Sequence, residues 1–233
     1  MNDTMPRLAV SACLVGEAVR YDGESRLQPL LEERWSRHLD LLPFCPEVEA
    51  GLGVPRPPIQ VRIDGRGARV VEVERPVRDH TSELRDAVEV IGSRLGEVDG
   101  WLFKARSPSC GVGSTPLFDP EGRESGVGDG LASGLLAPDR EGVPVGEETL
   151  LEDRGAREGF VERLFVAFRW RRQVVAEGEA TRRFLHAHRT HLALRDEGFL
   201  GRWLRRLAEG ADGAACRKEM LKLLQRPWEG GNM

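Results

Sequence analysis

The chain of 233 residues is long enough for one large or two small domains with a real hydrophobic core. It has no apolar run of about eighteen residues, which excludes a membrane-spanning helix, and its first residues lack the basic flank and apolar stretch of a signal peptide. Four cysteines without such a signal predict a cytoplasmic protein whose thiols stay reduced and serve as ligands or nucleophiles.

The net charge of −4 is unevenly distributed along the chain. Residues 1–153 contain 17 Lys and Arg against 28 Asp and Glu, whereas residues 154–233 contain 17 against 10. A basic half next to an acidic half favours a nucleic acid or another acidic partner for the basic half. An Arg-rich, solvated helical face explains the same asymmetry without any partner.

In the first half of the chain, apolar runs typical of buried parallel strands alternate with helical and hairpin patterns. The predicted elements are, in chain order, a strand over 8–14, a helix over 27–37, a strand over 39–44, a hairpin of 59–63 and 68–73, a helix over 81–95, a strand over 100–104, and a glycine-rich loop over 111–134 with a short strand at 115–118. This order predicts an α/β domain with a largely parallel sheet and flanking helices.

Pro, Gly and acidic residues interrupt the periodicity at about 139–153, which predicts a domain boundary. Beyond it, apolar residues recur at helical spacing, so a small all-α domain is expected to follow the sheet. We therefore expect an α/β domain over residues 1–145 and a helical, basic domain over residues 154–233.

One cysteine follows each of the three apolar runs predicted as parallel strands: Cys13, Cys45 and Cys110. Ligands gather beyond the carboxyl ends of the strands in open α/β sheets, so neighbouring strands would bring these thiolates together as a metal or iron–sulfur site. The spacings of 32 and 65 residues match no zinc or ferredoxin motif, and a cysteine is often only a small core residue. Three protein ligands would leave one position open for a substrate atom, which is a catalytic arrangement.

Polar residues beside two of these cysteines are candidates for catalysis. Glu47 lies two residues after Cys45, and in an extended loop two such residues point the same way, so the carboxylate would activate water as a general base in the same pocket. Ser107 and Ser109 would donate hydrogen bonds to an anionic sulfur or to a substrate carbonyl. The alternatives are a surface glutamate and serines that only form a turn.

The stretches SACLVGEAVRYDG, FCPEVEAGLGVPR and KARSPSCGVG, in this order, resemble the TudS-like thiouracil desulfidase family over about residues 7–150. The resemblance implies a 4Fe–4S cluster held by Cys13, Cys45 and Cys110, with a fourth iron that the protein does not bind. That iron is expected to take sulfur from a thiolated pyrimidine, leaving an oxo-pyrimidine and releasing sulfide.

The same resemblance assigns roles to polar residues of the three motifs. Glu47, in Cys-Pro-Glu, is implied as the acid/base residue, and Ser107, the first serine of Ser-Pro-Ser-Cys, as a second catalytic residue. Ser11 and Ser109 are expected to bind the substrate.

The basic half is similar, through GFVERLFVAFRWRRQV and FLHAHRTHLAL, to the helical YbgA-like domain that follows the desulfidase domain in many relatives. Relatives with both domains are similar to enzymes that remove sulfur from 4-thiouridine in tRNA. The resemblance therefore implies a tRNA substrate, for which Arg171, Arg172 and Arg189 are the expected binding residues. This chain departs from the pattern because the usual His-Lys pair reads His188-Arg189 and the domain ends early.

Other functions remain open on the same residues. The substrate is either 4-thiouridine in tRNA or a free thiouracil or thiouridine nucleotide. The three cysteines would also suit a structural or hydrolytic zinc protein, and the basic half a tRNA-binding module on an inert scaffold. Cys216, on a predicted amphipathic helix, is expected to take no part in any of these.

Overall fold

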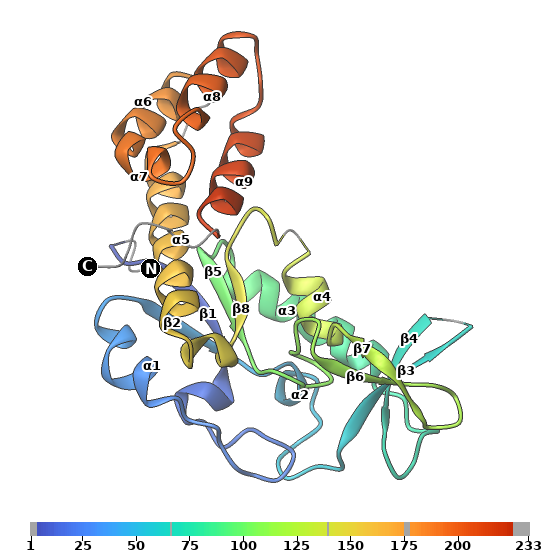
Figure 1. Ribbon diagram of the computed structural model, residues 1–233. Helices are drawn as coiled ribbons and strands as arrows, with labels where there is room; N and C mark the ends of the chain where they lie inside the picture. The colour runs from blue at the N-terminus through green and yellow to red at the C-terminus, as the bar shows by residue number, and fades with distance from the viewer. Residues whose placement is uncertain (1–3, 66, 139, 175–177, 226–233) are drawn as a thin grey trace.

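The computed structural model describes residues 4–65, 67–138, 140–174 and 178–225 (Figure 1). In this part of the chain two four-stranded sheets are followed by a group of helices. None of the helices described is both long enough and apolar enough to cross a membrane.

Sheet A is entirely parallel. Its strands are β1 (Arg7–Ser11), β2 (Asp40–Phe44), β5 (Gly100–Phe103) and β8 (Val145–Glu147), in the order β2-β1-β5-β8. The chain places β2 on one side of β1 and β5 on the other, so the strand order reverses at β1. Next to such a reversal the carboxyl ends of the strands form the crevice in which ligands bind.

Helices cover both faces of sheet A, because successive side chains of a strand point to opposite faces. Leu8 and Val10 of β1 pack with α1 (Pro29–Glu33) and the first turns of α5 (Arg154–Gln173), whereas Ala9 packs on the side of α3 (Thr81–Leu95). This arrangement confirms the predicted α/β class with a largely parallel sheet and flanking helices.

Helix α3 has the predicted bounds and the predicted buried face. The buried residues of its apolar stripe are Leu84, Ala87, Val88, Ile91 and Leu95. The start of the helix is held by Asp79, whose Oδ1 accepts a hydrogen bond from the Thr81 amide at 2.9 Å.

Sheet B is mixed and lies beside sheet A (Figure 1). Its strands are β3 (Ile59–Asp64), β4 (Gly67–Glu72), β6 (Thr115–Phe118) and β7 (Glu124–Gly128), in the order β4-β3-β6-β7. The β3–β4 pair is the predicted hairpin. Residues 111–134 were predicted as a loop with one short strand, and this prediction was incomplete. The segment also contains β7 and the start of α4 (Leu131–Leu136).

Two further predictions about local structure were wrong, and one strand was not predicted at all. The first strand ends at Ser11, and Ala12–Val15 form a 3-10 helix that carries Cys13. The helix predicted over 27–37 is divided into α1 and a 3-10 turn, Trp35–Arg37. The predicted boundary region contains β8, a strand of only three residues that pairs with β5 and has no apolar run to reveal it.

The second half of the described chain is helical. It consists of α5, α6 (Glu179–Ala187), α7 (Arg189–Ala193), α8 (Phe199–Ala208) and α9 (Gly213–Leu223). These helices bury a core of their own, whose largest members include Trp170, Phe184, Trp203 and Met220.

Helix α5 joins this core to sheet A, because Phe160 and Leu164 pack against the sheet while Trp170 packs among the later helices. The division into two domains at residues 145 and 154 stays a prediction. In Figure 1, α6 to α9 stand above sheet A and the short helix α2 (Pro46–Glu49) lies below it.

Candidate functional site

A cavity of about 360 Å³ lies at the carboxyl ends of β1, β2 and β5, and the three motif cysteines line it. Cys13 belongs to the 3-10 turn directly after β1, and Cys45 is the N-cap residue of α2, directly after β2. Cys110 follows β5 in the Ser-Pro-Ser-Cys turn. Because the three strands are parallel neighbours, their carboxyl ends meet, and the structure brings these cysteines together.

All three thiols are free, and burial disfavours their charged form. Burial, together with the nearby Cys45 thiol, raises the pKa of Cys13 to about 11. Burial also raises the pKa of Cys45. It raises the pKa of Cys110 well above the ordinary value, although a hydrogen bond from Ser11 lowers that pKa. The Cys45 thiol contributes to the raised pKa of both Cys13 and Cys110, as expected of sulfur atoms around one cavity.

The spacing of these thiols bears on the kind of metal centre they suit. Within the described residues, no three His, Cys, Asp or Glu side chains stand close enough to share a single metal ion. Three cysteine thiols that line one cavity are the kind of donor set that an iron–sulfur cluster requires, with each thiolate on a different iron.

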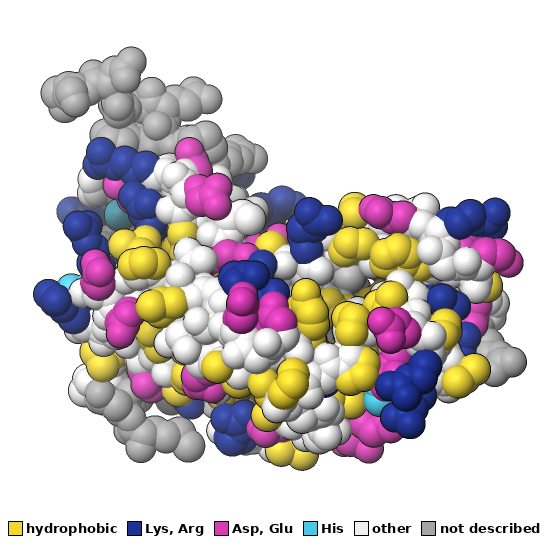
Figure 2. Space-filling view, turned by 90° about the horizontal axis from the view of Figure 1, so that it is seen from below, with side chains coloured by type: hydrophobic (Ala, Val, Ile, Leu, Met, Phe, Trp, Pro, Cys, Tyr) yellow, Lys and Arg dark blue, Asp and Glu magenta, His cyan; other side chains and the backbone are white. Residues whose placement is uncertain are grey.

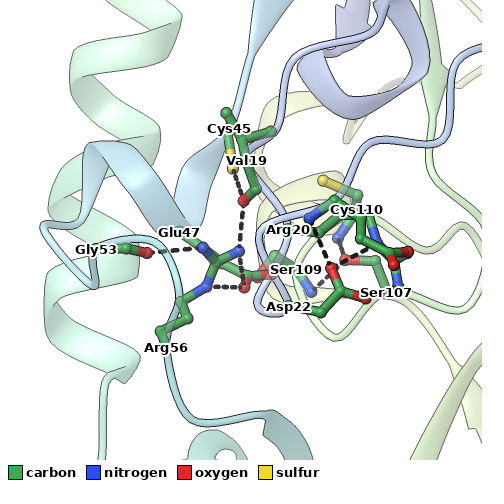
Figure 3. A network of polar contacts seen from close by, with 11 residues as sticks. Val19, Arg20, Asp22, Cys45, Glu47, Gly53, Arg56, Ser107, Ser109 and Cys110 are labelled. Atoms are coloured by element: carbon green, nitrogen blue, oxygen red, sulfur yellow. Dashed lines mark hydrogen bonds and ion pairs between the residues drawn. The ribbon is translucent and has the colours of Figure 1, made fainter.

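Glu47 lines the same cavity from α2, although the reason given for its position was wrong. Its segment is a short helix with Pro46 in the first turn, where proline is favoured, and is not an extended loop. Glu47 as a whole residue is only 8% exposed. Its Oε2 accepts hydrogen bonds from Arg56, at 2.8 Å from Nε, and its Oε1 accepts one from Ser109 Oγ at 2.9 Å (Figure 3).

The three serines of the motifs hold different positions. Ser107 lines the cavity, and its Oγ accepts hydrogen bonds from the amides of Ser109 and Cys110 at 3.2 and 3.1 Å, so it also shapes the cysteine turn. Ser109 is fully buried behind Glu47. Ser11 lines the cavity, and its Oγ accepts a hydrogen bond from the Lys104 amide at 3.0 Å.

Two glutamates that the sequence patterns did not single out hold both ends of the third cysteine loop. Glu148 accepts a hydrogen bond from the Ala105 amide at 2.6 Å and pairs with Lys104 before the turn. Glu147 accepts one from the Val112 amide at 2.6 Å after the turn. Glu147 is the last residue of β8, and Glu148 follows it. Because the strand was not predicted from the sequence, no sequence pattern indicated that these two glutamates belong to the site.

Most of the cationic side chains that line the cavity already have acidic partners. Arg20 pairs with Asp22 at 3.0 Å, and Lys104 with Glu148, while Arg56 pairs with Glu47. Figure 2, which views the molecule from below, likewise shows Lys and Arg side chains interspersed with Asp and Glu. On this face the described residues form no continuous basic patch.

Arg171, one of the expected tRNA-binding residues, lies where α5 meets sheet A. Its Nε and one terminal nitrogen bind the carboxylate of Asp99 at 2.9 and 3.0 Å, and Asp99 is fully buried. The Arg7 amide donates to the same carboxylate at 2.8 Å. Most of the Arg171 side chain is therefore buried within the protein, whereas Arg172 and Arg189 are exposed.

This placement predicts a large effect of Arg171 on stability. Arg171→Ala leaves the Asp99 carboxylate buried without its partner, which is expected to lower the free energy of unfolding by about 3–5 kcal/mol. Denaturant titration of the metal-free protein measures it. The matched control is Arg172→Ala, the exposed neighbour, which should change stability by no more than about 0.5 kcal/mol. Equal stability of the two variants would contradict the assigned ion pair.

The sequence profile of the 2-thiouracil desulfurase family matches residues 8–148, which is more than half of the chain. This chain belongs to the 2-thiouracil desulfurase family. The matched region contains all three cavity cysteines, Glu47 and the serines of the site. It ends at Glu148, so the helices from α5 onward lie outside it.

Among solved structures, the [4Fe-4S]-dependent thiouracil desulfidase TudS is similar to this chain. The two share 32% sequence identity over 63% of this chain and 93% of that one, with a TM-score of 0.48. No curated protein sequence matches the chain.

Proposed function

We propose that this desulfidase removes sulfur from a thiolated pyrimidine with the help of a 4Fe–4S cluster held by Cys13, Cys45 and Cys110. The observation that carries the proposal is the shared cavity, in which these cysteines and the buried Glu47 carboxylate face one another at the carboxyl edge of a parallel sheet. When bound, such a cluster supplies an iron without a protein ligand, which accepts sulfur.

The overall reaction needs water but no external oxidant or reductant. Replacing the thiocarbonyl sulfur of a pyrimidine by the oxygen of water breaks one C=S bond and forms one C=O bond. The two protons of the water leave with the sulfur as H₂S. The protein must therefore hold the pyrimidine, admit one water molecule and move a proton between them.

Glu47 is the residue placed to move that proton. Each of its oxygens accepts hydrogen bonds from the protein side, Oε2 from Arg56 and Oε1 from Ser109. Two nitrogens of Arg56 approach Oε2, whereas Oε1 accepts only from the Ser109 hydroxyl and keeps one of its two lone pairs to accept a proton from water in the cavity. Ser107, on the same cavity wall, has a hydroxyl hydrogen free to donate to a substrate carbonyl, because its oxygen accepts the bonds that shape the turn.

Anaerobic purification tests the proposal directly. The expected result is a brown protein that contains about four irons and equivalent sulfide per chain and releases sulfide from thiouracil or 4-thiouridine. A colourless protein with one zinc per chain, no sulfide release and the metal bound by the same cysteines would replace the proposal with a zinc site.

We further propose 4-thiouridine in tRNA as the substrate, with the basic helical half as the surface that holds the RNA. The supports are the excess of Lys and Arg after residue 153 and the exposure of Arg172 and Arg189. Helices α6 to α9 stand at the opposite end of sheet A from α2 in Figure 1, so only a long substrate would touch both. Contacts of this kind go mostly to phosphates, which position a substrate without reading its sequence.

Replacing Arg172 and Arg189 together with alanine is expected to weaken tRNA desulfidation and to leave free thiouracil turnover unchanged. Each lost phosphate contact should also lower the log–log salt slope of tRNA binding by roughly 0.7–0.9. Arg154→Ala, in the same half and paired with Glu158, is the control. Equal tRNA turnover by the double variant and the parent would leave the free base or nucleotide as the substrate.

A further inference from the structure

A continuous chain of hydrogen bonds joins the three cysteine loops, and Arg56 is its central member (Figure 3). Arg56 Nε and one terminal nitrogen lie 2.8 and 2.7 Å from Glu47 Oε2. The same terminal nitrogen donates to the Val19 carbonyl at 2.9 Å, and the other donates to the Gly53 carbonyl at 2.9 Å. The Arg56 side chain is only 4% exposed.

The contacts in this chain reach all three cysteine loops. Val19 belongs to the loop that leaves Cys13, and its carbonyl oxygen also lies 3.9 Å from Cys45 Sγ. Glu47 belongs to the turn that follows Cys45. Ser109, directly before Cys110, donates to the other oxygen of Glu47 at 2.9 Å. The first loop is thus tied to the second through Arg56, and the second to the third through Glu47.

Only arginine suits this position. Each of the three guanidinium nitrogens donates a hydrogen bond, to three acceptors from two segments, and one of them also forms the ion pair with Glu47. A lysine ammonium is a point charge on a flexible stem and cannot reach these acceptors together. Although Arg56 lines the cavity, its donors are committed to the protein, which distinguishes it from a residue that binds substrate.

We propose that Arg56 is a positioning residue that holds the Glu47 carboxylate toward the cavity and fixes the cysteine loops before any cluster is bound. The part concerning Glu47 rests on the proposed function, whereas the part concerning the loops does not. A carboxylate displaced by about 1 Å from its productive position can cost about 10²-fold in rate.

Arg56→Lys tests the catalytic part of the proposal. The expected result is a kcat per bound iron lowered by up to about 10²-fold with little change in KM. The variant loses the orientation of the Glu47 carboxylate, which matters in the transition state. The matched control is Arg94→Lys, which alters an exposed ion pair, 2.6 Å long, to Glu49 on the same helix α2 and should leave kcat unchanged. A kcat per iron equal to that of the parent in Arg56→Lys would overturn the role.

A double-variant experiment shows whether Arg56 acts through Glu47. In a Glu47→Gln background the further change Arg56→Lys should have almost no effect on kcat, since residues that act as a unit are not additive. An undiminished effect in that background would mean that Arg56 acts on the reaction separately, and would overturn the proposal. If Arg56→Lys does not fold, Ser109→Ala removes the other bond to Glu47 and is expected to show the same dependence on Glu47.

The role of Arg56 in fixing the cysteine loops can be tested on the metal-free protein, without measuring desulfidation. Alkylation by iodoacetamide, resolved for each cysteine by mass spectrometry, should become faster at Cys45 in Arg56→Lys and stay unchanged in Arg94→Lys. An unchanged rate at Cys45 would overturn the role in fixing the loops. If the parent protein released no sulfide from any thiolated pyrimidine, the proposed function would fail, while the alkylation result would still decide this role of Arg56.

Discussion

Serine in place of Cys13, Cys45 or Cys110 is expected to abolish the proposed iron–sulfur cluster, because thiolates are the proposed ligands and all three cysteines line one cavity. A serine hydroxyl is a hard and weakly acidic ligand that does not replace thiolate on iron. Iron and sulfide per chain after anaerobic reconstitution, together with the visible absorbance, measure the loss. Sulfide release from thiouracil should disappear in the same variants.

Cys216→Ser provides the control for these variants. Cys216 is fully buried in α9 among the apolar residues of the helical core, far from the cavity lining. Its replacement buries a hydroxyl group and should lower the free energy of unfolding by about 1–3 kcal/mol, while the iron content stays at the parent level. A folded Cys216→Ser protein without iron, or an iron-loaded Cys45→Ser protein, would show that the ligand set is different.

Glu47→Gln is expected to keep the cluster and lose turnover. Removing a general base typically lowers the rate by on the order of 10²–10⁴. The amide can preserve the chain of contacts, since its oxygen accepts from Arg56 and its nitrogen donates to Ser109 Oγ. The loss should therefore appear in kcat per bound iron, measured as sulfide release, and not in the iron content.

Glu49→Gln is the matched control, because Glu49 lies in the same short helix and pairs outward with Arg94. Its turnover should equal that of the parent. Near-normal sulfide release by iron-loaded Glu47→Gln would return Glu47 to a structural role as the link between Arg56 and Ser109.

The proposed function gives the Glu47 carboxylate two tasks, which the variants separate. As a proton carrier it needs its charge, which glutamine removes. As a member of the hydrogen-bonded chain it needs its shape, which glutamine keeps and alanine removes. Glu47→Ala should accordingly lose turnover and also expose the Cys45 loop to alkylation, as Arg56→Lys does.

Several features of this protein were determined by the sequence alone. Short apolar runs predicted the parallel strands, and helical spacing predicted α3 with its buried face, because both patterns follow from local backbone geometry. Each cysteine lies in the segment that follows one of the strands, so a parallel sheet was enough to predict that they meet. The three motifs around them carried the resemblance to the desulfidase family.

The tertiary structure alone decided how the Glu47 carboxylate is held and how the two halves of the chain are joined. Ser109 lies 62 residues from Glu47, and Arg171 lies 72 residues from Asp99. No local pattern links such pairs, because the free energy of a buried ion pair or hydrogen bond depends on burial and on the fork geometry of its partners. Strand β8 was hidden for a related reason: its three residues gain their stability from pairing with β5, and nothing in Val-Gly-Glu itself favours a strand.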